Sequence, residues 1–273
     1  MITRITTSAI GIAIGITILF LINTPVFNIA VAAVAVIMLT ELFSAVKCTE
    51  NKLSCGICLV FAGLMPFFNY GNFGEYRLLF TALCAVLLFL SYIIKHHDIT
   101  YEKVFFMISS SALVTYAINC LISLNKLSDE HGVAYVVLAL CGAWIADSGA
   151  YFVGISLGKH KLCPEISPKK TVEGFIGGLL SNGIFFVLYC IVYTKYFTDG
   201  ATVNYVIAFI LGLVCACLGL IGDLTASLIK RQCKIKDYGN IMPGHGGLMD
   251  RFDSVLFVVP FMFVYLSYLN IFE

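Results

Sequence analysis

Nine segments of the chain are built almost entirely from apolar residues, and polar residues gather in the short stretches between them. A helix needs about 20 predominantly apolar residues to cross a bilayer. The longest polar stretch, residues 230–253, is too short to form a soluble domain. The pattern therefore predicts an all-α polytopic integral membrane protein whose spans run roughly over residues 8–22, 27–46, 53–68, 77–94, 104–124, 133–157, 172–194, 203–229 and 254–271.

The first of these segments is short and is preceded by one basic residue, Arg4. A secretory signal peptide is the alternative interpretation, but no small-residue cleavage site follows the segment. We therefore expect it to be retained as the first transmembrane helix.

The composition excludes several classes of protein. Hydrophobic residues make up 60% of the chain and charged residues 12%, whereas soluble domains carry about 25% charged residues. An ordinary soluble enzyme, a disordered chain and a disulfide-stapled secreted module are all excluded. Most of the eleven cysteines lie in apolar runs, where cysteine packs as a small hydrophobe. Packing is also the favoured interpretation of the pair Cys55 and Cys58, with a redox or metal role as the alternative.

The distribution of basic residues predicts the orientation. With the N-terminus in the cytosol, nine spans place 14 of the 17 lysines and arginines on the cytosolic side, and the exceptions are Arg77, Lys126 and Lys195. Cytosolic loops are enriched in these residues. The basic loops at residues 159–171 and 230–253 then lie on the same, cytosolic side, where they can form one site.

Three acidic residues, Glu41, Asp147 and Asp223, lie at least five residues inside predicted spans. A carboxylate in the bilayer costs at least a few kcal/mol, so it is retained with a partner or a function. Small and polar residues surround Asp147 and Asp223, which favours a water-filled cavity open to the cytosol. A salt-bridged strut between helices is the alternative for both. For Glu41 the strut is the favoured interpretation, because its sequence neighbours are apolar.

Both basic loops have the character of phosphate-binding segments. In the first, Ser167 and Pro168 precede Lys169, Lys170 and Thr171, and Thr171 can cap the following helix beside Glu173. A helix N-terminus with adjacent lysines favours anions. Binding of anionic lipid headgroups is the alternative.

The second loop combines cations, glycines and acids. Lys230, Arg231, Lys234 and Lys236 offer N–H donors, and Gly244, Gly246 and Gly247 surround His245. Glycines allow tight turns that direct backbone amides at an anion. Asp250 and Asp253 follow at the start of the last span. Acids beside phosphate-binding cations suit a divalent metal such as Mg²⁺, which takes one or two carboxylates plus substrate phosphates. A merely solvated basic loop is the alternative.

Residues 227–253 resemble the signature of the CDP-diacylglycerol synthases, also called phosphatidate cytidylyltransferases. The matching positions are Ser227, Lys230, Arg231, Lys236, Asp237, Pro243, His245, Gly246, Gly247, Asp250, Arg251 and Asp253. Met242 stands where the pattern has Leu, Ile or Phe, and it keeps the apolar bulk. Residues 147–152, 158–162, 166–174 and 222–224 also resemble this family. The resemblance divides the chain into residues 1–132, with five spans, and residues 133–273, a catalytic region with four spans and both loops.

The resemblance implies transfer of a cytidylyl group from CTP to phosphatidate with Mg²⁺ as cofactor, and K⁺ is a candidate second ion. It implies that Asp223 and Asp250 hold the metal, with Asp147 as a third candidate ligand. The groups expected to bind phosphates are Lys169, Lys170, Lys230, Arg231, Arg251, Lys236, Ser167, Ser227 and His245. Asp237 and Asp253 are expected to orient basic neighbours.

The expected partners are CTP, phosphatidate and membrane lipids, together with a second copy in a homodimer, and no nucleic acid is expected. The expected location is a bacterial inner membrane with the active site facing the cytosol. A related CTP-dependent lipid kinase and a transporter that uses the intramembrane acids are the alternatives. No repeat between the two halves, of the kind that transporters often show, is visible in the sequence.

Overall fold

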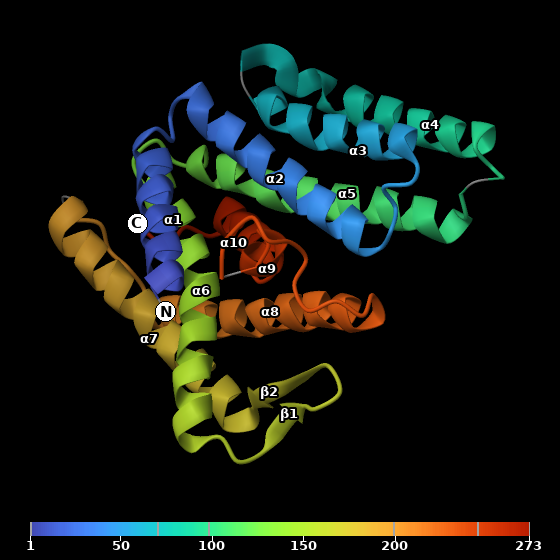
Figure 1. Cartoon of the computed structure of the whole chain (residues 1–273). Helices are drawn as coiled ribbons and strands as arrows, with labels where there is room; N and C mark the ends of the chain where they lie inside the picture. The colour runs from blue at the N-terminus through green and yellow to red at the C-terminus, as the bar shows by residue number, and fades with distance from the viewer. Residues whose placement is uncertain (1, 70, 98, 199, 245, 273) are drawn as a thin grey trace. The chain divides into compact units, whose positions relative to one another are not determined.

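A computed structural model of the chain describes residues 2–69, 71–97, 99–198, 200–244 and 246–272, and within these ranges the side chains of 2–5, 8, 71 and 72 are left out. Figure 1 shows the helices and the short hairpin of the chain. The chain folds into two compact units. The first unit comprises Met1–Ser123 and Gln232–Phe252, and the second comprises Leu124–Arg231 and Asp253–Glu273. These units do not follow the functional boundary expected at residue 132, which remains a prediction.

The first unit is helical. Its elements are α1 (Ile2–Phe20), α2 (Pro25–Ala45), α3 (Lys52–Leu64), η1 (Met65–Asn69), η2 (Gly71–Tyr76), α4 (Arg77–Ile94), nearly all of α5 (Tyr101–Asn125) and α9 (Met249–Phe252). Capping residues set two helix starts. Thr24 accepts a hydrogen bond from the backbone N–H of Val26 ahead of α2, and Asn51 accepts two from the first turn of α3. Such caps satisfy N–H groups that have no partner within the helix.

Apolar packing holds α3 against α2 and α4. Phe61 and Met65 are buried with Cys84 of α4. One polar pair crosses the same interface, because the hydroxyls of Ser54 and Ser91 lie 2.7 Å apart and are buried. Hydrogen bonds between polar side chains of neighbouring helices are a recurrent means of joining helices in membranes.

The second unit contains the helices α6 (Gly132–Leu157), α7 (Val172–Phe197), α8 (Tyr205–Gln232) and α10 (Val255–Tyr268). The last residue of α8, Gln232, is assigned to the first unit. A hairpin of β1 (Lys161–Cys163) and β2 (Ser167–Thr171) lies between α6 and α7 in the chain. The antiparallel strands pair Lys161 with Thr171 and Cys163 with Ser167. This hairpin is a small departure from the predicted all-α class, and it forms from the first basic loop.

Small residues let α6 and α7 pack closely along their length. A Cβ atom added at Gly174 would lie 2.7 Å from the carbonyl oxygen of Ala150, and one added at Gly178 would lie 2.8 Å from that of Ala146. These distances are too short for real atoms, so both positions require glycine. Close approach of helix backbones at small residues is typical of membrane helices.

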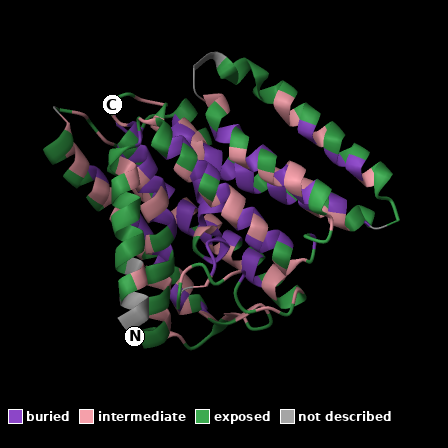
Figure 2. Cartoon of the chain, turned by 45° about the horizontal axis from the view of Figure 1, so that its top comes forward, coloured by how far each residue is buried: buried purple, intermediate pink, exposed green. Residues whose placement is uncertain are grey.

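The helices confirm the polytopic membrane class. Within the described residues, seven helices are long and apolar enough to cross a bilayer, and two shorter apolar helices cover Ala9–Phe20 and Val255–Tyr268. Many large apolar side chains are exposed, and Leu78 and Leu79 of α4 are 79% and 66% exposed. Figure 2 shows exposed residues over much of the helix surface. Exposed apolar surface of this extent suits contact with lipid. The exact number of nine spans and the orientation remain predictions.

Candidate active site

The second unit brings Lys170 of β2 to Asp223 of α8. The ammonium nitrogen lies 2.5 Å from a carboxylate oxygen of Asp223. This nitrogen is buried, and the described residues offer it no hydrogen-bond acceptor beyond that ion pair. One helical turn after Asp223, the Ser227 hydroxyl donates a 3.2 Å hydrogen bond to the other carboxylate oxygen. Since an ammonium group carries three N–H donors, Lys170 keeps donors for a further anion.

A second cluster joins α6 to the start of α10. The Ser254 hydroxyl donates to Asp147 at 3.0 Å, and the Ser254 backbone N–H donates to Asp253 at 2.8 Å. Gly222 lets α8 approach closely, because an added Cβ atom would overlap the backbone carbonyl of Asp253. The cluster therefore combines Asp147 and Asp253 beside the helix that carries Asp223.

The electrostatics of this cluster show an excess of negative charge. Burial raises the pKa of Asp253 to about 7, and the charges of Asp223 and Asp147 act in the same direction. The Ser254 N–H and the Lys230 charge oppose the shift. A buried carboxyl with acidic neighbours is expected to behave in this way. The site would therefore be stabilised by an added cation.

Both ends of the β1–β2 hairpin are fixed to helices. At the tip, the Arg231 guanidinium donates to the carbonyl oxygen of Ile166 at 3.1 Å. At the base, Thr171 caps α7 by accepting the N–H of Gly174, which confirms the cap predicted from the sequence. Glu173 accepts hydrogen bonds from the backbone of Lys159 and from the ring and backbone of His160. The hairpin is thus a fixed support for Lys170.

In the first unit, Asp250 stabilises the glycine-rich loop. Its buried carboxylate accepts the N–H groups of Tyr238 at 2.8 Å and Gly247 at 3.0 Å. Gly244 and Gly246 have φ angles of +81° and +86°, a conformation that favours glycine. His245, expected to donate to a phosphate, lies outside the described residues.

Glu41 of α2 makes contacts that the sequence did not reveal. Its carboxylate accepts the N–H groups of Leu248 and Met249 at 3.0 and 2.8 Å. The described residues form no ion pair with it. The salt-bridged strut therefore stays a prediction, and the contacts that the structure does show are backbone hydrogen bonds. The partners are backbone amides more than 200 residues away, so residue types could not have revealed them.

The remaining candidates are distributed over both units. Ser167 and Lys230 are partly buried in the second unit, where Lys169 and Arg231 are exposed. In the first unit, the exposed residues are Lys236, Asp237 and Arg251. Asp223 and Asp250 belong to different units, so neither unit alone contains the expected metal pair.

The donor chemistry fits Mg²⁺ although the part of the chain that the structure describes contains no multidentate protein cage. Among the side chains that the structure describes, no group of three or more His, Cys, Asp or Glu could hold a metal ion. Mg²⁺ usually takes one or two carboxylates and completes its coordination with waters and substrate phosphates. The carboxylates in and around the negatively charged cluster are therefore suitable donors.

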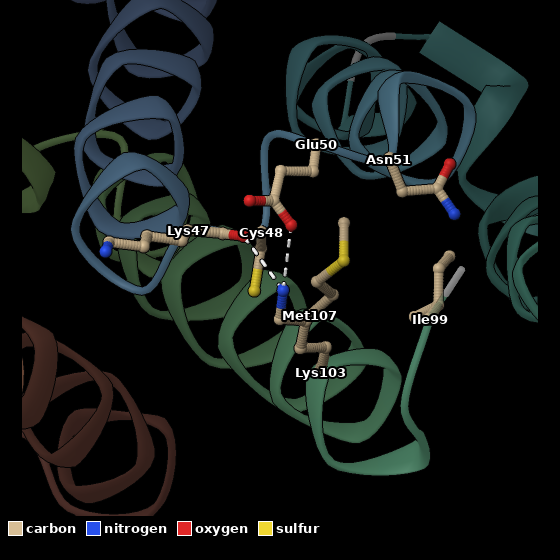
Figure 3. Close-up of a pocket in the computed structure, with 7 residues that line it drawn as sticks. All are labelled: Lys47, Cys48, Glu50, Asn51, Ile99, Lys103 and Met107. Carbon is tan, nitrogen blue, oxygen red and sulfur yellow. Dashed lines mark hydrogen bonds and ion pairs between the residues drawn. The ribbon is translucent and has the colours of Figure 1, made fainter. Parts of the chain in front are cut away.

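A separate pocket lies between the α2–α3 loop and α5. Figure 3 shows Lys103 reaching toward that loop, where its ammonium group lies 3.1 Å from a Glu50 carboxylate oxygen and 3.3 Å from the Lys47 carbonyl oxygen. Burial raises the pKa of the nearby Cys48 thiol, which disfavours a reactive thiolate. The pocket contains none of the candidate site residues, and its contacts fasten the loop to α5.

Comparison with known proteins agrees with the resemblance in the signature region. A model of the cytidylyltransferase family matches residues 2–269. A phosphatidate cytidylyltransferase of Bacillus subtilis (strain 168) is 36% identical over 267 residues, which cover 94% of this chain and 95% of that protein. A phosphatidate cytidylyltransferase of Staphylococcus aureus (strain COL) is 44% identical over 133 residues, 49% of each chain. Because the family match extends over nearly the whole chain, this protein belongs to the cytidylyltransferase family.

Proposed function

We propose that this protein transfers a cytidylyl group from CTP to phosphatidate and releases pyrophosphate. A phosphate oxygen of phosphatidate attacks the α-phosphorus of CTP, the bond from that phosphorus to the β-phosphate oxygen breaks, and CDP-diacylglycerol forms. The relative that matches 94% of the chain carries the corresponding name. The structural observation that supports it most is the buried Lys170 ammonium, held by Asp223 with donors remaining.

In this reaction the protein mainly has to position the two substrates and neutralise the charge of their phosphates. The phosphate of phosphatidate is an anion near neutral pH, so attack requires no strong general base. Lys170 would bind a phosphate from the hairpin, and Ser227 would add a hydroxyl donor from α8. The other cations proposed to contact phosphates are Lys169, Lys230, Arg231, Lys236 and Arg251, with Ser167 and His245 as further donors.

We further propose that Asp223 and Asp250 hold Mg²⁺, with Asp147 as an additional ligand. The negative charge excess around Asp253 supports a cation there. Bound Mg²⁺ would withdraw electron density from the α-phosphoryl group and neutralise charge on the departing pyrophosphate. Asp237 and Asp253 would orient basic groups, and K⁺ would be a second ion.

The proposed setting is an inner membrane with nine spans, a cytosolic N-terminus and an active site facing the cytosol. Among the described residues, seven helices of membrane-spanning length and two shorter apolar helices support it, as do the 14 basic residues on one predicted side. Phosphatidate would enter from the membrane and CTP from the cytosol. A homodimer is part of the same proposal.

The test is a turnover assay on the purified chain in detergent with CTP, phosphatidate and Mg²⁺. We expect CDP-diacylglycerol and pyrophosphate in equal amounts, with loss of both on addition of EDTA and recovery with excess Mg²⁺. Omission of phosphatidate is the control for CTP hydrolysis. A folded protein that binds CTP but forms no CDP-lipid would contradict the proposal.

A further inference from the structure

Glu41 occupies an unusual position for an acidic residue. It lies near the end of α2, in a helix long and apolar enough to span the membrane, and only 6% of its surface is exposed. A buried carboxylate needs compensating hydrogen bonds. Glu41 obtains them from the consecutive N–H groups of Leu248 and Met249, directly before Asp250. The carboxylate therefore connects the second helix to the signature loop, which we define as residues 238–250.

Two glycines of the signature loop make room for this carboxylate. A Cβ atom added at Gly247 would lie 2.5 Å from a carboxylate oxygen of Glu41, and one added at Gly239 would also overlap the carboxylate. For both glycines, the three nearest described atoms to the added Cβ all belong to Glu41. The lack of a side chain at these positions is therefore explained by the approach of Glu41.

Glu41 and Asp250 accept successive backbone N–H groups of one short segment. The Gly247 N–H donates to Asp250, and the next two N–H groups donate to Glu41. Asp250 also accepts the Tyr238 N–H from the start of the loop. The orientation of the Asp250 carboxylate thus depends on a backbone that Glu41 holds from the other side.

We propose that Glu41 is a positioning residue of the active site. It fixes the signature loop and thereby holds the Asp250 carboxylate in the orientation needed for its proposed role as a metal ligand. It acts through backbone amides and touches neither substrate nor metal. The effect on turnover rests on the proposed role of Asp250, whereas the effect on the loop does not.

The first test replaces Glu41 with glutamine, which keeps the size but turns an amide group toward one of the two N–H donors. We expect kcat to fall at least tenfold while the KM for phosphatidate stays within twofold. Hydrogen exchange, measured by mass spectrometry in detergent, should accelerate at least tenfold at the amides of Leu248 and Met249. Exchange in α6 and α7 should remain unchanged. Glu50→Gln, in the exposed loop after α2, is the matched control and should change neither quantity.

A second test keeps the proposal falsifiable if Glu41→Gln folds poorly. Gly247→Ala alone should lower kcat at least tenfold, because its methyl group overlaps the Glu41 carboxylate. Combined with Glu41→Ala, which removes that carboxylate, the same methyl group should lower kcat less than twofold further. Equal effects of Gly247→Ala in both backgrounds, or unchanged exchange at Leu248 and Met249 in Glu41→Gln, would overturn the proposal. Retained turnover in Asp250→Asn would instead refute the role of Asp250 and leave the exchange result to judge Glu41.

Discussion

At the scale of single residues, the candidate site depends on acidic side chains with defined partners. Asp223 pairs with Lys170 and accepts the Ser227 hydroxyl, while Asp147 accepts the Ser254 hydroxyl. Salt-bridged struts were the alternative interpretation for Asp147 and Asp223, and Asp223 does form an ion pair. Asp147 and Asp253 lie near this pair, and Lys170 keeps donors for a further anion, which supports the proposed role in binding phosphate.

We expect Asp223→Asn and Asp250→Asn each to lower kcat more than 100-fold. Each change removes a negative charge from the proposed Mg²⁺ site, while the amide preserves the shape of the side chain. Turnover with phosphatidate is the measurement, and the elution profile in detergent reports folding. Asp129→Asn, at an exposed acid after α5, is the control. Near-normal turnover by either variant would refute its assignment as a metal ligand.

Lys170→Met should lower kcat/KM for CTP roughly 10- to 100-fold. The change removes charged hydrogen-bond donors, each worth about 1.5–3 kcal/mol, and leaves Asp223 without its partner. Steady-state kinetics with varied CTP would measure it. Lys161→Met on the other strand of the hairpin is the matched control, since Lys161 is exposed. If both variants behaved alike, the hairpin lysines would act only through their general positive charge.

At the scale of elements, close packing of α6 and α7 holds the base of the hairpin. Thr171 ends β2 and caps α7, and a Cβ atom added at Gly158 would meet the Thr171 side chain. The ion pair of Lys170 with Asp223 therefore relies on the fit between these two helices. Substitutions at the interface of α6 and α7, although far from the site, should therefore disturb this ion pair.

Gly178→Ala should destabilise the protein by about 1–3 kcal/mol, since its methyl group would meet the Ala146 carbonyl oxygen at 2.8 Å. The midpoint of thermal unfolding in detergent would fall accordingly. Gly56→Ala is the control, because a Cβ atom there meets no atom within 4 Å. An equal midpoint for the two variants would show that α6 and α7 can separate without loss of stability.

Sequence patterns predicted local features better than distant contacts. The apolar segments located the helices, and Thr171 was correctly identified as a cap because its function depends on neighbours in the chain. The hairpin was missed, since its strands of three and five residues show no apolar alternation. The partners of Glu41 were missed because backbone amides leave no trace in residue type.

At the scale of the whole molecule, membrane orientation determines which substrates can reach the site. A reporter enzyme that is active only outside the cytosol, fused after residue 273, should be active, and the same reporter at the N-terminus should be inactive. This result follows from nine spans and the predicted charge asymmetry. Equal activity at both ends would indicate an even number of spans and require another assignment of the loops.

The bond between Glu41 and the signature loop also bears on biogenesis. Glu41 is synthesised 207 residues before Leu248, its first amide partner. At about 5–20 residues per second, the acid is incorporated on the order of 10–40 s before that partner exists. During this interval α2 has already reached the insertion machinery. Water, lipid headgroups or the translocation machinery must therefore accommodate the carboxylate until the last tenth of the polypeptide is made.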